Sequence, residues 1–206
     1  MVHTRPQASP RPGRVTAQDA DERRVAEIAG HVRAILHVLG VDPADPHVID
    51  TPERVAEMYL ELLPGVTTPV LPGLSTFPSS GGSADLVSVR DVPFYSLCAH
   101  HLLPFFGQAH VTYLPAERII GLGSIADVVD HFARRPQVQE RLTDQVLASL
   151  VQALAPVGAL VVLRARHLCT EMRGPRRTSV LTTSAAHGVL AGPAARDVFL
   201  RLAADG

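Results

Sequence analysis

Both cysteines of the chain lie beside histidines, at spacings that suit a shared metal ion. Cys98 and His101 are separated by two residues, which lets both side chains reach one ion. His167 and Cys169 are two residues apart at the end of a segment that alternates apolar residues, so we expect them to share one face of a strand. Two cysteines are too few for a disulfide scaffold, which leaves a metal site or buried thiols.

Cys98, His101 and Cys169 together would give zinc three protein ligands. Such a set leaves the fourth position of the metal open for water, as in catalytic rather than structural zinc sites. His100 and His167 would then lie near the metal without binding it, and the near-neutral pKa of histidine suits general acid–base catalysis. A structural metal site and plain core packing are the alternatives, because buried cysteines are common in protein cores.

Helical and strand patterns indicate which elements position these residues. Apolar residues recur at helical spacing over residues 17–39, and Thr51 with Pro52 marks the N-cap and first turn of a helix reaching residue 63. Further patterns predict strands over 86–92, 106–114, 157–169 and 178–186, and helices over 124–135, 138–155 and 193–204. Strand pairs that flank a helical pair favour an α+β fold with an antiparallel sheet.

The same patterns divide the chain into four regions. Residues 1–15 are rich in Pro and Arg without an apolar period, so we expect a disordered tail. We expect residues 16–64 to form an N-terminal helical segment, residues 65–85 to form a loop, and residues 86–206 to form the domain that carries the candidate catalytic residues.

Composition narrows the class of protein. The formal net charge of −1 does not resemble the strongly basic balance of a nucleic-acid-binding protein. The chain has neither an apolar run long enough to span a membrane nor an N-terminal segment of signal-peptide type, so we expect no membrane association and a cytoplasmic location.

The stretch from about Asp50 to Leu190 resembles the GTP cyclohydrolase I family in the order and spacing of its motifs. The matching strings are TPERVA from Thr51, FYSLCAHHLLPFFGQAHVTYLP from Phe94, GL from Gly121, ARRPQVQERLT from Ala133, RHLC from Arg166 and MRG from Met172. The resemblance implies a tunnelling fold, whose subunits join through their sheets into barrels and assemble as a homo-oligomer, typically a decamer.

The resemblance also implies roles for the residues of the site. Zn²⁺ would be bound by Cys98, His101 and Cys169, and His100 and His167 would assist proton transfer. The zinc would lower the pKa of its bound water towards about 7, so that hydroxide attacks C8 of the purine while a histidine protonates N7. The imidazole ring of the purine then opens and C8 leaves as formate.

Four further residues are implied to bind the substrate. Glu140, with Gln139 beside it, would hold the guanine edge, because a carboxylate can accept hydrogen bonds from both the ring N–H and the exocyclic amine. Arg173 would contact phosphate, and Arg54 is a second candidate for that contact.

The sequence departs from the family's Gly-Leu-Ser-Lys-x-x-Arg pattern. Gly123 takes the place of Ser, Ser124 of Lys and Asp127 of Arg, and Ala99 replaces the usual Glu after the first cysteine. Positions 124 and 127 share one helix face near a helix N-terminus, a place suited to phosphate. Each lost charge-assisted contact costs about 1.5–3 kcal/mol, and Asp127 adds repulsion.

These departures leave three interpretations open. GTP could still be the substrate if Arg176 or Arg177 compensates beside Arg173. The substrate could instead be GMP, guanosine or guanine, with the reaction stopping at a diaminopyrimidine. A non-catalytic binding or regulatory relative is the third interpretation, which the intact set of cysteines and histidines disfavours. A nitrile reductase of the same fold, with a cysteine nucleophile and no metal, is disfavoured by the second cysteine on the far strand.

Overall fold

In the computed structural model, two helices form an N-terminal unit that spans residues 1–61. Helix α1 covers Ala17–Val38 and helix α2 covers Thr51–Leu62, which confirms the two helices expected there. Helix α2 begins at Thr51 itself, and the carbonyl of Asp50 accepts the Arg54 N–H at 3.1 Å. Within this unit, Arg33 of α1 and Glu53 of α2 form an ion pair at 2.5 Å.

The structure describes residues 17–68, 71, 73–79, 86–193 and 197. The predicted tail, residues 1–15, lies outside these ranges, and so does the predicted helix over residues 193–204 except at residues 193 and 197. Among the described residues, no helix is long and apolar enough to cross a membrane.

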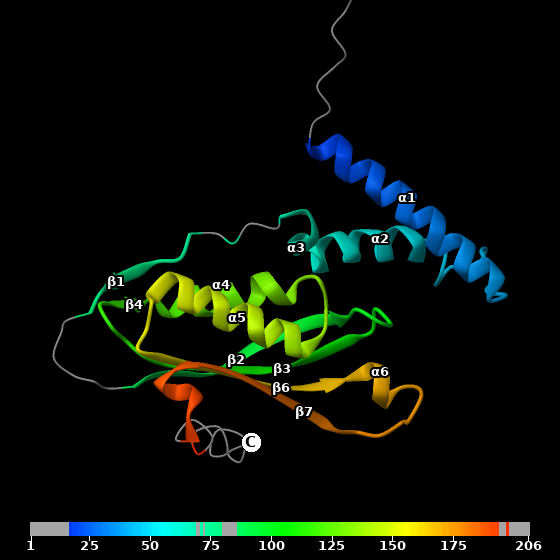
Figure 1. The fold of residues 1–206 in the computed structure, drawn as a ribbon. Helices are drawn as coiled ribbons and strands as arrows, with labels where there is room; N and C mark the ends of the chain where they lie inside the picture. Colours follow the sequence, from blue (N-terminus) through cyan, green and yellow to red (C-terminus); the bar gives the residue numbers. More distant parts are fainter. Residues whose placement is uncertain (1–16, 69–70, 72, 80–85, 194–196, 198–206) are drawn as a thin grey trace, which may run out of the picture. The chain divides into compact units, whose positions relative to one another are not determined.

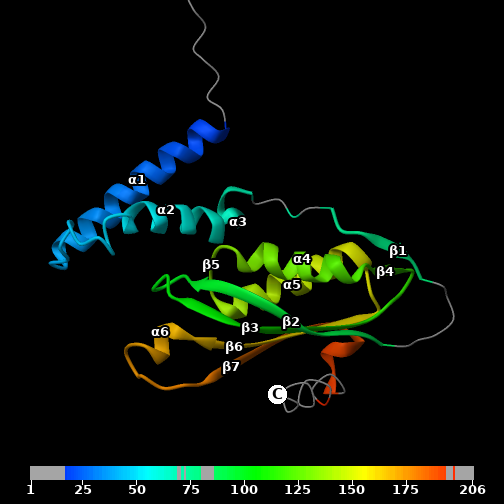
Figure 2. The same ribbon diagram turned by 180° about the vertical axis from the view of Figure 1, so that it is seen from behind.

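A five-stranded sheet with the order β5-β2-β3-β6-β7 forms the second unit, residues 62–206. Its strands are β2 (Val87–Cys98), β3 (Pro104–Leu114), β5 (Pro136–Gln137), β6 (Gly158–His167) and β7 (Val180–Gly188). The four long strands pair antiparallel, and only the short β5 runs parallel to its neighbour β2. Helices α4 (Leu122–Ala133) and α5 (Gln139–Leu154) lie on one face of the sheet (Figure 1, and from behind in Figure 2). The expected α+β class is confirmed.

The segment expected to be a loop, residues 65–85, contains regular structure. The short helix α3 (Pro64–Thr67) begins it, and strand β1 (Thr76–Pro78) pairs antiparallel with β4 (Arg118–Ile120). These elements are too short to show a period in the sequence, so the pattern analysis missed them. The β1–β4 pair fixes the start of α4, because the carbonyl of Ser75 accepts the Gly121 N–H at 2.9 Å.

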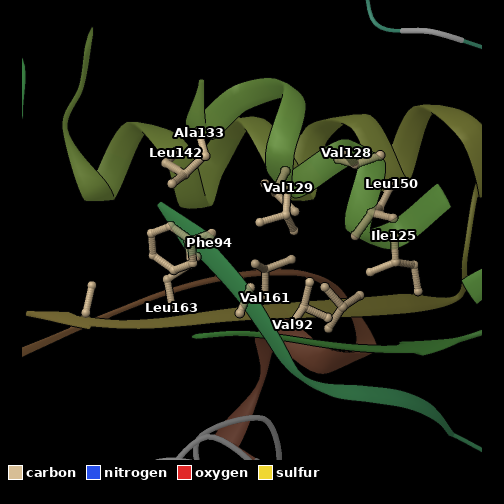
Figure 3. Close-up of a cluster of buried hydrophobic side chains, with 14 of the residues drawn as sticks. Val92, Phe94, Ile125, Val128, Val129, Ala133, Leu142, Leu150, Val161 and Leu163 are labelled. Carbon is tan, nitrogen blue, oxygen red and sulfur yellow. The ribbon is translucent and has the colours of Figure 1, made fainter. Parts of the chain in front are cut away.

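The hydrophobic core lies between the helical pair and the sheet (Figure 3). Ile125, Val128 and Val129 of α4 follow helical spacing and turn towards the sheet, where they are at most 1 % exposed. Val161 and Leu163 of β6 alternate along the strand and point back at the helices. Burial of each such side chain contributes roughly 1.5–3 kcal/mol, so the core holds the strand ends and the start of α5 in fixed register.

Candidate active site

The candidate site forms at the end of β2, opposite the end of β6. After Cys98 the chain turns sharply, and the carbonyl of Cys98 accepts the N–H groups of His101 at 3.2 Å and of Leu102 at 2.8 Å. Leu102 has a φ of 53°, and this left-handed conformation closes the turn that returns His101 to Cys98. Strand β3 lies between β2 and β6 and pairs Phe105 with His167, which brings His167 to the same end of the sheet.

Cys98, His101 and Cys169 are brought together there. Their ligand atoms all lie within 4.8 Å of one another, and Cys98 Sγ is 3.9 Å from His101 Nδ1. Around tetrahedral zinc, with Zn–S near 2.3 Å and Zn–N near 2.1 Å, two ligand atoms lie roughly 3.6 Å apart. Two sulfur atoms and one imidazole nitrogen are also ligands that zinc favours. These residues therefore fit a zinc ion after small movements.

The position of Cys169 differs from the sequence expectation. Strand β6 ends at His167, and Cys169 lies in the short helix α6 (Leu168–Glu171) rather than on the strand face beside His167. The Thr170 hydroxyl donates to the carbonyl of His167 at 2.9 Å, and the Met172 N–H donates to that of Leu168 at 2.9 Å. The sequence gives no period for a single helical turn, and this turn is what allows Cys169 to join the cluster.

The two predicted proton-transfer histidines have different surroundings. His100 is exposed, and its Nδ1 lies 3.8 Å from Cys98 Sγ. His167 is half-buried, its ring lies parallel to that of Phe105, and its Nε2 is 2.8 Å from Gln139 Oε1. His167 is therefore held in a fixed orientation, whereas His100 faces solvent.

The charges around the site act on the titratable groups in it. Burial lowers the pKa of His167, and the carboxylates of Glu140 and Glu171 oppose that shift. Burial raises the pKa of the Cys169 thiol, the neighbouring Cys98 adds to the rise, and Arg173 opposes it. Metal binding requires thiolates, so these surroundings make metal binding depend on pH.

The residues predicted to bind substrate fall into three places. Glu140, in the first turn of α5, and Arg173, just after α6, are exposed and close enough to the site for their charges to act on it. Gln139 is fully buried and its side chain contacts protein groups. Arg54 lies on α2 in the N-terminal unit, where it pairs with Asp50 at 3.1 Å. The role of Arg54 stays a prediction.

The altered positions lie in the first turns of α4. Gly123 and Asp127 are exposed, whereas Ser124 is buried, and its hydroxyl oxygen accepts the Ser75 N–H at 3.0 Å. Residues 121–127 include no Lys or Arg. The start of α4 therefore offers main-chain N–H groups and a carboxylate but no cationic side chain.

Sequence reasoning missed two residues of the site. Phe105 lies under the ring of His167, a relationship that only the pairing of β3 with β6 reveals. Glu171 forms an ion pair with Arg166 at 2.5 Å, which lowers the pKa of Glu171, and its charge acts on His167. Arg166 and Glu171 lie on either side of the end of β6, and their five-residue separation matches no sequence motif that would predict an ion pair.

Together, the fold and these groups define a class of protein. It is an α+β protein that combines a metal-competent Cys-His-Cys cluster with two further histidines close to that cluster. Comparison with known proteins then identifies its family. The family model for GTP cyclohydrolase I matches residues 28–204.

Relatives of the chain carry the same name. GTP cyclohydrolase 1 of Geobacillus kaustophilus is 45% identical over 170 residues, which cover 82% of this chain and 90% of that protein. The namesake of Leifsonia xyli subsp. xyli is 45% identical over 179 residues, covering 86% and 94%. GTP cyclohydrolase 1 of Allorhizobium ampelinum is 48% identical over 161 residues, which cover 77% of this chain and 80% of that protein. The crystal structure of the archaeosine synthase QueF-Like in the apo form aligns with 52% of this chain and 97% of its own, at 18% identity and a TM-score of 0.43.

The chain belongs to the GTP cyclohydrolase I family. It is a hydrolase of the cyclohydrolase class that acts on a purine. The family is metal-dependent, uses a guanine nucleotide and typically forms oligomers, and the Cys98-His101-Cys169 cluster is the possible metal site of this member.

Proposed function

We propose that the chain is a zinc-dependent hydrolase that opens the imidazole ring of a guanine compound at C8 and releases formate, and that this compound carries fewer phosphates than GTP. The substrate would be GMP, guanosine or guanine. The observation that carries the substrate proposal is the start of α4, where Gly123, Ser124 and Asp127 replace the Ser, Lys and Arg of the family pattern.

The Cys98, His101 and Cys169 side chains would hold the zinc ion. When bound there, zinc would supply the Lewis acidity that activates water for attack on C8. The two sulfur atoms are buried and the imidazole is exposed, so the cluster opens to solvent on the side of His101. A substrate could approach from that side.

His100 and His167 would move the protons of the reaction. Protonation of N7 makes C8 more electrophilic, and the same nitrogen must carry a proton when the C8–N bond breaks. The lowered pKa of His167 favours its neutral form at neutral pH, and nearby Glu140 and Glu171 favour its protonated form, so both forms are within reach. His167 is the better placed of the two to donate in a fixed direction, because its ring is held on two sides.

Recognition of guanine would rest on Glu140. Its carboxylate is exposed in the first turn of α5, beside the site, and can accept from the ring N–H and exocyclic amine together. Gln139 would add a main-chain contact at most, because its side chain is enclosed. Arg173 would bind a phosphate if the substrate carries one, with Arg54 as a second candidate.

The electrostatics of α4 argue against a triphosphate. A helix N-terminus attracts phosphate through its free N–H groups, but the family pattern adds two cations that are missing here. Asp127 is exposed one turn along the helix and repels an anion placed there. Gly123 also lacks the hydroxyl that the serine of the family pattern would bring to the sugar rearrangement, so we propose that the reaction stops at a diaminopyrimidine.

A conventional GTP cyclohydrolase I is the second candidate, favoured by one local feature. Arg173, Arg176 and Arg177 are all exposed in the loop after α6. The Arg177 N–H donates to the carbonyl of Thr170 at 3.1 Å, which folds this loop back on α6. These three cationic side chains could bind the phosphates in place of the cations that the start of α4 lacks.

A homo-oligomer, and specifically a decamer, is part of the proposal. Strand β7 lies at the edge of the sheet and most of its residues are exposed, and such an edge is available for pairing with another strand. Mass measurement in solution would test the number of subunits.

A substrate panel tests the proposed function. Zinc-loaded protein is incubated separately with GTP, GMP, guanosine and guanine, and formate and the remaining product are identified by mass spectrometry. We expect a ring-opened pyrimidine and formate from one of the three substrates with fewer phosphates, with GTP turned over slowly or not at all. A dihydropterin triphosphate formed readily from GTP would establish the second candidate instead, and no formate from any substrate would refute both.

A further inference from the structure

Gln139 is an enclosed polar side chain at the first position of α5. It is fully buried, and its amide nitrogen lies within 3.0 Å of the Leu163 carbonyl oxygen, 3.1 Å of that of Leu181 and 3.1 Å of Thr183 Oγ1. Its amide oxygen lies 2.8 Å from Nε2 of His167. These contacts connect the ring of His167 to the main chain of its own strand at Leu163 and to strand β7.

The direction of each hydrogen bond follows from the two main-chain carbonyl oxygens that contact the Gln139 amide group. Carbonyl oxygens only accept, so the Gln139 NH₂ group must face Leu163 and Leu181, and its Oε1 must face His167. An amide oxygen also only accepts, so the proton between Gln139 and His167 belongs to His167 Nε2.

The neighbouring threonines agree with this direction. Thr143 Oγ1 donates to the carbonyl of Gln139 at 2.8 Å, so its single proton is used there. Thr183 Oγ1, 2.6 Å from Thr143 Oγ1, must then donate to Thr143, which leaves the Thr183 oxygen free to accept from Gln139. The two amide protons of Gln139 are then shared among three acceptors, the carbonyls of Leu163 and Leu181 and the hydroxyl oxygen of Thr183.

We propose that Gln139 is a positioning residue that holds the ring of His167 in one orientation, with the Nε2–H directed at Gln139 Oε1, so that Nδ1 is the nitrogen left to face the substrate. The kinetic consequence of this orientation rests on the proposed function, whereas the orientation itself does not.

Phe105 completes the positioning of the ring. Its phenyl ring lies 4.6 Å from that of His167 with 3° between the planes, and it is fully buried. The stacking fixes the plane of the imidazole, and the hydrogen bond to Gln139 fixes its rotation within that plane. Only one nitrogen is then left to face the substrate.

The tautomer can be read directly by NMR. In ¹⁵N-labelled, zinc-loaded protein, the ring-nitrogen shifts of His167, assigned by comparison with His167→Ala, distinguish an N–H nitrogen from one with a lone pair. We expect the wild type to show Nε2–H and a lone pair on Nδ1 when neutral. We expect Gln139→Met to lose this preference and give a mixture, because it removes the acceptor while keeping a similar side-chain size. An Nδ1–H wild type would overturn the inference without any variant.

Enzyme kinetics provide the second test. The rate of formate release is measured with whichever of GTP, GMP, guanosine and guanine is turned over fastest. We expect Gln139→Met to lower kcat by about tenfold or more with KM within about twofold and the zinc content unchanged. Gln145→Met is the matched control, since Gln145 is on the same helix but contacts Gln137 at 2.7 Å, and its kcat should be unchanged. Gln139→Met should have no further effect in a His167→Ala background.

An unchanged kcat in Gln139→Met, or a loss confined to KM, would overturn the positioning role. Absence of formate from every substrate in the wild type would instead refute the proposed function, and the NMR reading would still decide the tautomer.

Discussion

The imidazole ring of His167 lies flat against the phenyl ring of Phe105, with the ring centroids 4.6 Å apart. The two residues are direct partners across β3 and β6, so the register of the sheet sets this contact. A residue of the hydrophobic core thereby determines the plane of the imidazole ring to which we assign proton transfer.

Replacement of Phe105 should therefore affect both stability and turnover. We expect Phe105→Leu to lower the free energy of unfolding by about 1–3 kcal/mol through lost packing, and to lower kcat more than it raises KM. Phe94→Leu is the control, because Phe94 is equally enclosed and meets Phe105 edge-on at 6.0 Å. It should destabilise similarly and leave kcat near the wild-type value. Equal kcat losses in both variants would show that general core damage explains the effect.

Zinc content should separate the two adjacent histidines. We expect Cys98→Ala and His101→Ala to lose zinc affinity and activity together. Loss of a residue that only hydrogen-bonds to a zinc ligand lowers metal affinity by roughly 10–100-fold, and loss of a ligand itself should lower it further. His100→Ala should keep one zinc per chain and lose turnover, since His100 is proposed to move protons. Metal analysis after dialysis against a weak chelator measures this difference. Full zinc content in Cys98→Ala would contradict the ligand assignment.

Restoring cations to α4 should raise activity towards GTP. Asp127→Arg alone removes repulsion without disturbing the Ser124 hydrogen bond to Ser75, and Ser124→Lys adds the second cation. Each charge-assisted contact contributes about 1.5–3 kcal/mol, so the double variant should gain at least about tenfold in kcat/KM for GTP and little for guanosine. Asp130→Arg, with the same charge change on an exposed position of α4, is the control and should gain little. Equal gains in kcat/KM from Asp130→Arg and from the changes at 124 and 127 would show that net charge, rather than contacts at these two positions, controls activity towards GTP.

Stability should decrease at mildly acidic pH because of His110. This residue is 2 % exposed on β3, its Nδ1 accepts the Asp91 N–H at 3.3 Å, and Nε2 has no hydrogen-bond partner among the described residues. Burial lowers the pKa of His110 below 6.5, Asp91 opposes the shift, and Arg90 and Arg164 add to it. As the pH falls through 6.5, the unfolded chain takes up a proton on His110 before the folded chain does. The contribution of His110 to the free energy of unfolding is therefore fully present above pH 6.5 and is lost progressively below it.

Urea unfolding at about pH 7.5 and about pH 5.5 measures this contribution. We expect His110→Asn to lose less stability between the two values than the wild type. Part of the wild-type loss should remain, since the pKa of His167 is lowered by the same cause. An identical loss in both proteins would show that His110 does not titrate in this range.

The sequence predicted most of the long elements and the residues that gather at the candidate metal site, because both leave periodic or spaced signals. The apolar faces of α4 and α5, the strand that carries His167 and the gathering of the cysteines with His101 were expected and are observed. Strand β2 continues to Cys98, past the end that was predicted for it at residue 92. What escaped prediction is short or depends on pairing. The single turn of α6 moves Cys169 off its strand, and β1, β4 and β5 are two or three residues long.

The surroundings of the predicted residues were also beyond the sequence. The resemblance implied that Gln139 stands beside Glu140 at the guanine edge, and its contribution there stays a prediction. The structure adds that α5 begins at Gln139 and that the Gln139 side chain turns inward to His167. The contact between Phe105 and His167 joins residues that are distant in sequence through an antiparallel register. Neither relationship follows from residue type or spacing.

A competition experiment tests the central claim most directly. Equal concentrations of GTP and GMP are mixed with the zinc-loaded protein, and the two products are quantified by mass spectrometry at low conversion, which gives the ratio of the two kcat/KM values. Guanosine and guanine are then each paired with GTP in the same way. We predict that at least one of GMP, guanosine and guanine is consumed in preference to GTP, with formate released in equal amount. Preferential conversion of GTP in all three mixtures would contradict the proposal.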